Sequence, residues 1–304
     1  MATFTKGINM NITQEKIFAV LPPPITQSRT YSSVWTQCDF QVEQVENDAT
    51  TMGRLKRYLL VEVDEKRSTV PLAAYCFMTG VVNALIFNAI FIWCGSQTGN
   101  SLQLSLAISR LLNLKRDYSF HLVDQQALCS VISFALAVFL GGSIGDKMGS
   151  KTRAWLFLGT FIQTLFTIAS AIVMWVGRES STADARYAPT WSDTLSFMFT
   201  GFLSASMGLQ GVMARRVNTH FGNTVALTAA WVDLMADPKL LDIRRLVPSR
   251  DHRILTIFCF VLGGFAGHVS LDKIGSARTL AITAGIRFAI SIWWLLTPGK
   301  DPRL

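Results

Sequence analysis

The stretch from Pro71 to Arg110 reads PLAAYCFMTGVVNALIFNAIFIWCGSQTGNSLQLSLAISR and decides the fold of this chain. Its first part, Pro71 to Gly95, carries no charged side chain and is long enough to cross a bilayer core of about 30 Å as a helix. Gly95 to Asn100 then interrupt the run with helix-breaking and polar residues, and a shorter helical pattern follows. A break at membrane depth frees backbone groups that lipid cannot satisfy, so it must face protein or a water-filled cavity. The stretch therefore predicts a membrane helix followed by a broken or re-entrant element.

The composition is that of an integral membrane protein. Hydrophobic residues make up 50% of the chain and charged residues 16%, whereas soluble proteins carry about a quarter charged residues. The net charge of +8 comes from Lys and Arg between the apolar runs, where the cytosolic side retains them, so no nucleic-acid partner is expected. The five cysteines lack CxxC spacing and the four histidines lack metal-ligand spacing. Neither a metal nor a cofactor is therefore expected.

The distribution of apolar residues divides the chain into four regions. Residues 1–50 are polar and mixed in charge, which predicts a disordered cytosolic tail. Residues 51–68 contain a helical pattern from Met52 to Val63, which fits either an amphipathic helix lying on the membrane or a solvated helix leading into the first span. Residues 69–177 and 190–298 are the two membrane regions.

The two membrane regions have the same order of helical patterns. After the first span, we expect spans at Ala127–Ile144, Ala154–Val176, Leu195–Ala214, Ile254–Val269 and Thr279–Leu296, and shorter, more polar helices at Ser101–Leu112 and Phe221–Ala236. Small residues recur every four positions along three of these spans, which lets a neighbouring helix approach closely. These stripes are Cys129, Ser133, Ala137, Gly141 and Gly145; Thr200, Ser204 and Gly208; and Cys259, Gly263 and Gly267.

Four short motifs recur in one order, which indicates an internal repeat. Thr79-Gly80 matches Thr200-Gly201, Gly99-Asn100 matches Gly222-Asn223, Leu140-Gly141-Gly142 matches Leu262-Gly263-Gly264, and Asp146-Lys147-x-Gly149-Ser150 matches Asp272-Lys273-x-Gly275-Ser276. The predicted fold is an all-α integral membrane protein with about six transmembrane helices in two inverted halves of three, plus two short broken or re-entrant helices. Eight spans in parallel halves is the alternative. Counts of Lys and Arg in the loops do not separate the two, and both place the termini in the cytosol.

Polar residues at matching places in the two halves are the candidate substrate-binding residues. Arg287 lies midway along the last span, where a charge costs at least about 2.5 kcal/mol on insertion scales, so it should face a partner or water. Asp233 in the second short helix is the candidate partner, and Gln163 lies at a similar depth without charge. A substrate contact, a structural buried pair and a side chain that reaches the interface are the three interpretations of Arg287. The candidate set is Asn83, Gln97, Thr98, Asn100, Gln210, Asn223, Thr224, Asp233 and Arg287; for its uncharged members the alternative is simple hydrogen bonding between helices.

The loop Gly142-x-x-x-Asp146-Lys147-x-Gly149-x-Lys151-x-Arg153 resembles the signature between the second and third helices of major facilitator transporters. In that family the acid and the bases clamp neighbouring helix ends and influence gating. The resemblance implies a gating role for Asp146, Lys147, Lys151 and Arg153, and for Asp272 and Lys273 in the repeated loop. The alternative is an ordinary basic turn between two membrane helices.

Five further stretches resemble the fungal branch of the YoaK-like integral membrane proteins, the family of domain of unknown function 1275. They are RLKRYLLVEVD (54–64), TGVVNALIFNA (79–89), QTGN (97–100), GLQGVMARR (208–216) and WVDLMADPKLL (231–241). The resemblance implies a multi-helix membrane protein of the kind called putative permeases. This chain has Asn83 where the family pattern Gly-x-Val-Asp-Ala has its acid, so any coupling that depends on that acid would be absent here.

Together these patterns predict a permease or carrier that moves an unidentified small molecule across a lipid bilayer by alternating access between the two halves. The second hypothesis is a non-transporting membrane scaffold or accessory protein, whose polar residues only hold helices together. An enzyme is not expected, because paired carboxylates, HExxH and Gly-x-Ser-x-Gly are all missing from the sequence.

Overall fold

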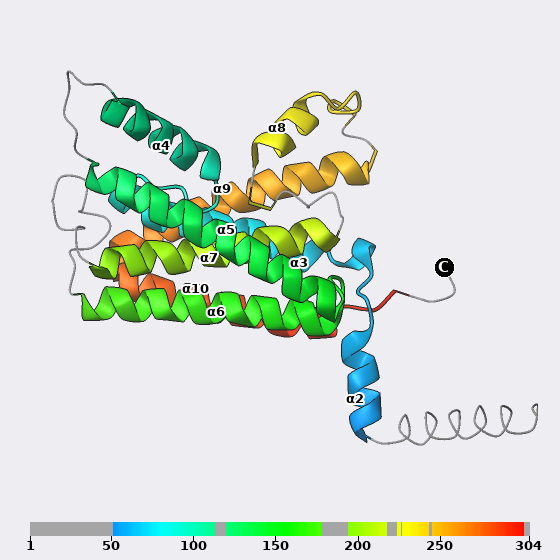
Figure 1. Ribbon diagram of the computed structural model, residues 1–304. Coiled ribbons are helices and arrows are strands. Elements are labelled where there is room, and N and C mark those ends of the chain that lie inside the picture. The colour runs from blue at the N-terminus through cyan, green and yellow to red at the C-terminus, as the bar shows by residue number, and fades with distance from the viewer. Residues whose placement is uncertain are drawn as a thin grey trace, which may run out of the picture. The chain divides into compact units, whose positions relative to one another are not determined.

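A computed structural model describes residues 51–112, 120–177, 194–217, 224–225, 227–242 and 245–300. The chain divides into two units, Met1–Leu55 and Lys56–Leu304, and the second contains every candidate span. The expected tail at 1–50 lies outside the described residues, as does Asn223. Figure 1 shows the second unit as a bundle of long helices, with two shorter helices, α4 and α8, beside it.

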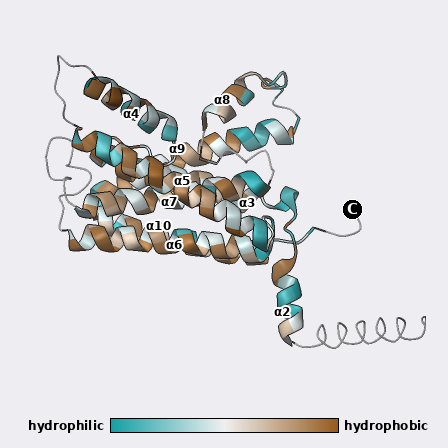
Figure 2. Ribbon diagram, in the orientation of Figure 1, coloured by the Kyte–Doolittle hydropathy of each residue, from teal (hydrophilic) through white to brown (hydrophobic). Residues whose placement is uncertain are grey.

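Six helices in the described part of the chain are long and apolar enough to cross a membrane. They are α3 (Thr69–Ile90), α5 (Leu122–Met148), α6 (Arg153–Val176), α7 (Thr194–Val217), α9 (Pro248–Ile274) and α10 (Ser276–Leu296). Hydrophobic colours dominate them in Figure 2, while hydrophilic colours gather at the start of α9 and in α2. The prediction of a multi-pass helical membrane protein is confirmed.

The two remaining helices of the membrane part are too short to cross. α4 (Gln97–Leu112) has 16 residues and α8 (Leu227–Met235) has 9, which at 1.5 Å per residue gives lengths of about 24 and 14 Å. A bilayer core of about 30 Å needs more. The described residues therefore contain six candidate spans, the number that the shortness of these two helices indicated. Both short helices lie at the breaks that the sequence marked.

The helices pack in three main pairs. α3 packs along α9, α5 along α7 and α6 along α10, while α6 also packs on α7. α3 and α7 are the most buried spans, and α5 and α9 are the least. The exposed sides of α5 and α9 carry large apolar side chains, including Phe139 and Phe258, as expected for surfaces that face lipid.

Glycines set the closest helix contacts. A Cβ at Gly263 would lie 2.0 Å from the backbone oxygen of Phe77, and one at Gly80 would lie 2.1 Å from that of Phe260, so the backbones of α3 and α9 touch. Between α5 and α7, a Cβ at Gly208 would lie 2.5 Å from the backbone oxygen of Phe134. The prediction that small-residue stripes allow close packing is confirmed for both pairs.

The helix before α3 ends earlier than the sequence pattern indicated. α2 spans Thr51–Leu60 and ends there, although the pattern continued to Val63. Val63 N donates to Lys151 O at 3.0 Å, and Lys300 N donates to Glu62 O at 2.8 Å. These bonds between distant segments replace helical ones, so Glu62 and Val63 form isolated β-bridges and a 3₁₀ turn at Glu65–Arg67 follows.

The same contacts gather three connections at one end of the bundle. The segment before α3 pairs with the loop between α5 and α6 and with the residues after α10. Arg153 reinforces the junction, because its Nε donates to Thr297 O at 3.0 Å and its guanidinium lies 4.1 Å from the centre of the Tyr58 ring. The start of the first span and the end of the last span therefore lie together.

Candidate functional site

The break after α3 lies inside the bundle. Phe91 ends the helix in the left-handed region at φ 58°, which is uncommon for a residue with a side chain. Phe87 meets Phe91 edge-on and stacks on Trp93 at 4.1 Å between ring centres, so aromatic contacts hold the reversal. The chain returns along α3, since Gly95 N donates to Asn83 Oδ1 at 3.3 Å.

The position of this break differs from the expected one. The sequence placed it at Gly95–Asn100, but residues 91–96 form the break and Gln97 begins α4. The difference arises because Phe91, with no helix-breaking character of its own, is the residue that adopts the left-handed conformation. Gly95 serves close packing, since a Cβ there would lie 3.3 Å from both Asn83 Nδ2 and Val225 Cγ1.

The second break meets the first. Thr224 and Val225 are the described residues just before α8, and Thr79 Oγ1 on α3 donates to Thr224 O at 3.0 Å. A Cβ at Gly95 would lie 3.3 Å from Val225 Cγ1, and one at Gly211 of α7 would lie 3.4 Å from Val225 Cγ2, so Val225 lies against both glycines. The breaks of the two membrane regions therefore lie side by side between α3 and α7.

Gln97 and Asn100 anchor the first break. Asn100 Nδ2 donates to Trp93 O at 3.0 Å, to Gln97 Oε1 at 2.9 Å and to Ser130 Oγ at 3.0 Å. The Ser130 hydroxyl continues to Ser204 on α7 at 2.8 Å. Because the donors and acceptors of Asn100 are occupied within the protein, its role in this conformation is to tie α4 to α5 and α7.

Two pockets flank the meeting point of the breaks. The α5–α7 pocket has a volume of about 370 Å³ and is lined by Gly95, Ser96, Gln97, Thr98, Phe134, Val138, Gly211, Val212, Arg215 and Val225. The α8–α9 pocket has a volume of about 320 Å³ and is lined by Asn83, Trp93, Ser96, Val225, Leu227, Thr228, Trp231, Phe260 and Val261. Ser96 and Val225 line both pockets. These two residues, one from each break, therefore mark the crossing of the breaks, which separates one pocket from the other.

A cluster of buried polar side chains continues from the breaks into the bundle, and we call it the polar core. Gln210 Nε2 on α7 donates to Thr79 Oγ1 at 2.8 Å and to Tyr75 O at 3.1 Å. The Tyr75 hydroxyl accepts from Trp294 Nε1 at 3.0 Å and is hydrogen-bonded to Thr160. The polar core comprises Tyr75, Thr79, Thr160, Gln163, Gln210, Arg287 and Trp294, from α3, α6, α7 and α10.

Arg287 is the one charged member of the polar core. Its residue exposure is 1%, and its Nη1 donates to Gln163 Oε1 at 2.7 Å. Its Nε and Nη2 have no hydrogen-bond partner among the described residues. The side chain therefore sits in the bundle with one neutral partner.

The expected pairing of Arg287 with Asp233 is wrong. Asp233 lies on α8, its side chain is 53% exposed, and it approaches Arg253 of α9 at 3.9 Å. Arg253 also pairs with Asp237 at 3.1 Å. α8 packs on the outer helix α9, so its acid does not reach the interior where α10 places Arg287.

The residues of the proposed gating loop take part in different contacts. Asp146 pairs with Arg216 of α7, and Lys151 pairs with Glu65 at 2.6 Å. Asp272 lies 3.6 Å from His268 on its own helix. Lys147 and Lys273 are exposed. The acid of the first loop thus links two spans, while that of the second stays within one helix.

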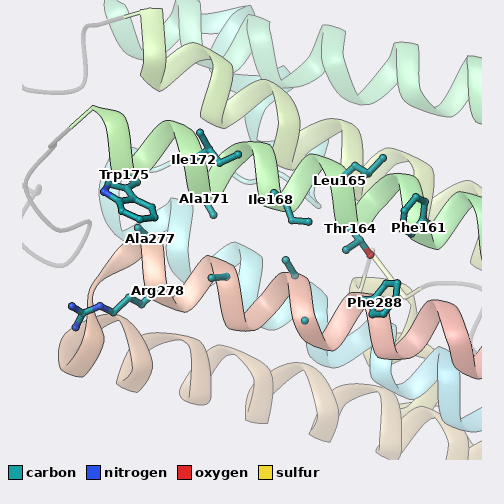
Figure 3. A pocket seen from close by; sticks show the side chains of 13 residues that line it. Phe161, Thr164, Leu165, Ile168, Ala171, Ile172, Trp175, Ala277, Arg278 and Phe288 are labelled. Carbon is teal, nitrogen blue, oxygen red and sulfur yellow. The ribbon is translucent and has the colours of Figure 1, made fainter.

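A third and larger pocket of about 910 Å³ lies along α6 and α10 (Figure 3). Aromatic and aliphatic side chains line most of it, with Trp175 and Arg278 at one end and Phe161 and Phe288 at the other. Thr164 is the polar residue along its length. Gln163, the neighbour of Thr164 in sequence, belongs to the polar core instead.

The sequence patterns identified part of this site. Asn83, Gln97 and Thr98 line the two pockets, Gln210 and Arg287 belong to the polar core, and Thr224 bonds to it. Tyr75, Thr160 and Trp294 were missed. A Tyr hydroxyl or an indole N–H inside a span needs a hydrogen-bond partner. That requirement could have pointed to Tyr75 and Trp294 as members of a buried polar cluster.

The chain was compared with curated proteins, solved structures and protein-family models. Neither a curated protein nor a solved structure matches the chain. A family model does match, and the match runs from α3 into α10, so it includes both breaks and Arg287. The chain belongs to the family described as protein of unknown function DUF1275, whose model matches residues 72–293.

Proposed function

We propose that this protein is a membrane carrier for a small molecule, which passes between the two breaks. The observation that carries the proposal is the contact of the two interrupted elements inside the bundle, with Gly95 beside Val225 and a pocket on either side. Interrupted helices that meet near the middle of a repeat interface are the usual binding elements of secondary transporters.

We propose further that the two halves form an inverted repeat. In this repeat, the helices of the two halves correspond in chain order, so that α3, α4, α5 and α6 match α7, α8, α9 and α10. Three contacts are preserved under this exchange, since α3–α9 becomes α7–α5, α4–α5 becomes α8–α9, and α6–α10 becomes itself, whereas α6–α7 is more extensive than its counterpart α10–α3. α4 and α8 also lie on one side of the bundle and point away from each other (Figure 1). Such a repeat gives a carrier two related conformations that open to opposite sides.

We base a proposal for the moving parts of the carrier on the packing. The tight glycine contacts join α3 to α9 and α5 to α7, so each tight pair takes one helix from each half. Rocking of one half against the other would break both contacts. We therefore assign the motion to the α3–α9 pair against the α5–α7 pair. The contact of α3 with α7 is small, and both breaks lie there.

We propose that both termini are cytosolic. Six crossings return the chain to the side from which it started, and Val63 and Gly299 pair at one end of the bundle. Reporter tags after Met1 and after Leu304 should both be cytosolic, and a tag within Arg110–His121 should be external. Termini on opposite sides would contradict the arrangement.

The second candidate function is a membrane scaffold that does not transport. The hydrogen bonds of Asn100 favour it, because they are satisfied within the protein and hold α4 to its neighbours. A scaffold needs these bonds but has no use for the two pockets.

An uptake experiment separates the two. The purified full chain is placed in liposomes, exposed to a mixture of small metabolites, and the trapped compounds are identified by mass spectrometry. A carrier concentrates or equilibrates particular compounds that empty liposomes exclude. Ser96→Trp, which fills both pockets, should abolish that uptake. Ser143→Trp on the exposed side of α5 is the matched control and should retain it.

The outcome that contradicts a carrier is equally clear. Retention of the same compounds by the wild type, Ser96→Trp and empty liposomes would leave the scaffold as the supported function.

A further inference from the structure

We propose that the molecule carried is a small anion with a carboxylate- or phosphate-type group, and that the guanidinium of Arg287 binds it. The inference rests on the proposed carrier function and adds the chemical class of the substrate. It depends on the charge, burial and hydrogen bonds of the polar core.

The first step is the missing counter-ion. In the described part of the chain, the buried carboxylate of Asp124 pairs with Arg110, and no carboxylate pairs with Arg287. A fully buried guanidinium whose only bond is to a neutral amide lacks the compensation that buried charges require. An anion bound beside it would supply that compensation.

The second step is the geometry of the free donors. The unpartnered nitrogens are Nε and Nη2, which point from the same edge of the guanidinium plane. Two parallel N–H donors match the two oxygens of a carboxylate or phosphate. The third nitrogen, Nη1, is held by Gln163 at 2.7 Å, which fixes the plane of the group.

The third step is the chemistry around the guanidinium. Gln163 Nε2 donates to the sulfur of Met213 at 3.3 Å, a weak acceptor. The nearby Tyr75 hydroxyl is already bonded to Thr160 and Trp294. Arg287 therefore contributes two donor nitrogens to the polar core that have no acceptor among the described residues. A ligand that carries acceptors satisfies these two nitrogens, and an oxyanion is such a ligand.

The fourth step concerns access. Arg287 is the twelfth residue of the 21 in α10, so at 1.5 Å per residue it lies about 15 Å from either end of the helix. That depth separates it from lipid headgroups and favours a free anion. Arg287 is not among the lining residues of the three pockets described above, so the anion reaches it when the helix pairs move apart. Gln210, Thr79 and Thr224 link the polar core to the breaks.

Thermal unfolding of the purified full chain in detergent tests this proposal. Sodium phosphate and sodium acetate are compared with sodium chloride at equal ionic strength. Binding to the folded state raises the midpoint, so we expect at least one oxyanion to raise Tm by more than about 2 °C in the wild type. Arg287→Gln should abolish the shift.

A second variant keeps the test decisive if Arg287→Gln does not fold. Gln163→Glu places a carboxylate beside Arg287, so it should raise Tm without ligand and remove the response to oxyanions. Gln210→Glu is the matched control, because it introduces a carboxylate at a buried glutamine of the same cluster that has no cation among its bonded neighbours. It should lower Tm.

Three results would overturn the proposal: no oxyanion shift in the wild type, an equal shift in Gln163→Glu, or a shift produced by phosphatidylglycerol in the micelles but by neither free oxyanion. The uptake experiment remains independent. Uptake of only neutral compounds would reject the anion and leave the carrier intact, whereas oxyanion binding without uptake would reject the carrier and leave the site.

Discussion

Two buried arginines of this protein have opposite surroundings. Arg250, at the start of α9, bonds to the Asp251 carboxylate through Nε and Nη2 and to the backbone oxygens of Lys239, Asp242 and Arg245. Arg287, in the middle of α10, bonds to the side chain of Gln163 and has two unpartnered nitrogens. The first arginine completes a loop at an end of the bundle. The second leaves hydrogen-bonding capacity in the interior, and this difference separates a structural cation from a candidate binding group.

The same contrast separates three cations at the ends of the bundle from several polar groups in its interior, although Arg110 Nε near the end of α4 also lacks a partner among the described residues. At the ends, Arg153, Lys151 and Arg216 each have a partner of opposite charge or a backbone oxygen. In the interior, Gln210 Oε1 and Thr224 Oγ1 join Arg287 in lacking partners within the described residues. If the unpartnered interior groups serve binding, then close helix packing must supply most of the stability of the interior. Variants of the glycines test the packing, and variants of the arginines test the polar groups.

The largest effect is expected at Gly263. Leucine there would force its Cβ to within 2.0 Å of the Phe77 backbone, which cannot rotate away, so α3 and α9 must separate. We expect Gly263→Leu to cost well above the roughly 3 kcal/mol typical of overpacking and to leave little folded protein. Size-exclusion chromatography in detergent measures this.

Gly141→Leu calibrates that result. Its Cβ would meet the Leu209 side chain at 2.5 Å, and a side chain can turn aside, so the cost should fall to about 1–3 kcal/mol. Phe139→Leu and Phe258→Leu, on exposed surfaces, should be mild. Equal recovery of all four variants would show that glycine contacts do not hold the interior together.

The next largest effect is expected at Arg250. Arg250→Met removes the buried side of an ion pair whose Asp251 carboxylate is partly exposed, and it leaves three backbone oxygens without their donor. Breaking a fully buried pair costs about 3–5 kcal/mol, and the partial exposure of Asp251 places the expected cost at the lower end of that range. We expect a large fall in Tm, measured by thermal unfolding in detergent, and the recovered folded protein should keep its oxyanion response.

Arg287→Met should have the reverse outcome. Replacing an uncompensated buried charge by an apolar group of similar length is often neutral or stabilising, so we expect a change in stability of about 1 kcal/mol or less. The oxyanion response and uptake should be lost. A fall in Tm as large as that of Arg250→Met would make Arg287 a structural residue.

The smallest effect on stability is expected at Asp146. Its pair with Arg216 is partly exposed, with side-chain exposures of 62% and 31%, and such pairs contribute about 0–1 kcal/mol. Asp146→Asn should therefore leave Tm nearly unchanged. If this pair favours one conformation of the carrier, the rate of uptake should change, and an unchanged rate would restrict Asp146 to the role of a loop residue.

Much of this architecture could be predicted from the sequence because the bilayer imposes strict local rules. Apolar runs marked the six spans, and Gly95 to Asn100 marked a break to within a few residues. Small-residue stripes marked the close contacts at Gly208 and Gly263. Each of these signals lies within a single stretch of chain.

What could not be predicted depends on contacts between distant stretches. No local pattern shows that Phe91 turns left-handed, because its aromatic neighbours hold it there. The partner of Arg287 depends on the rotation of α10 relative to α6, which packing determines, so Gln163 was noted by depth but not paired. The end of α2 at Leu60 depends on residues 151 and 298–300, which lie far along the chain.

The most direct test of the central claim is whether the crossing of the breaks is reached from both sides of the membrane. Ser96 lines both pockets, so Ser96→Cys is introduced after Cys38, Cys129 and Cys259 are replaced by serine; Cys76 and Cys94 are buried. Sealed vesicles of each orientation are treated with a membrane-impermeant maleimide. The account predicts labelling of Ser96→Cys in both orientations and none of Ser143→Cys on the exposed side of α5. Labelling from one side only, or from neither, would contradict it.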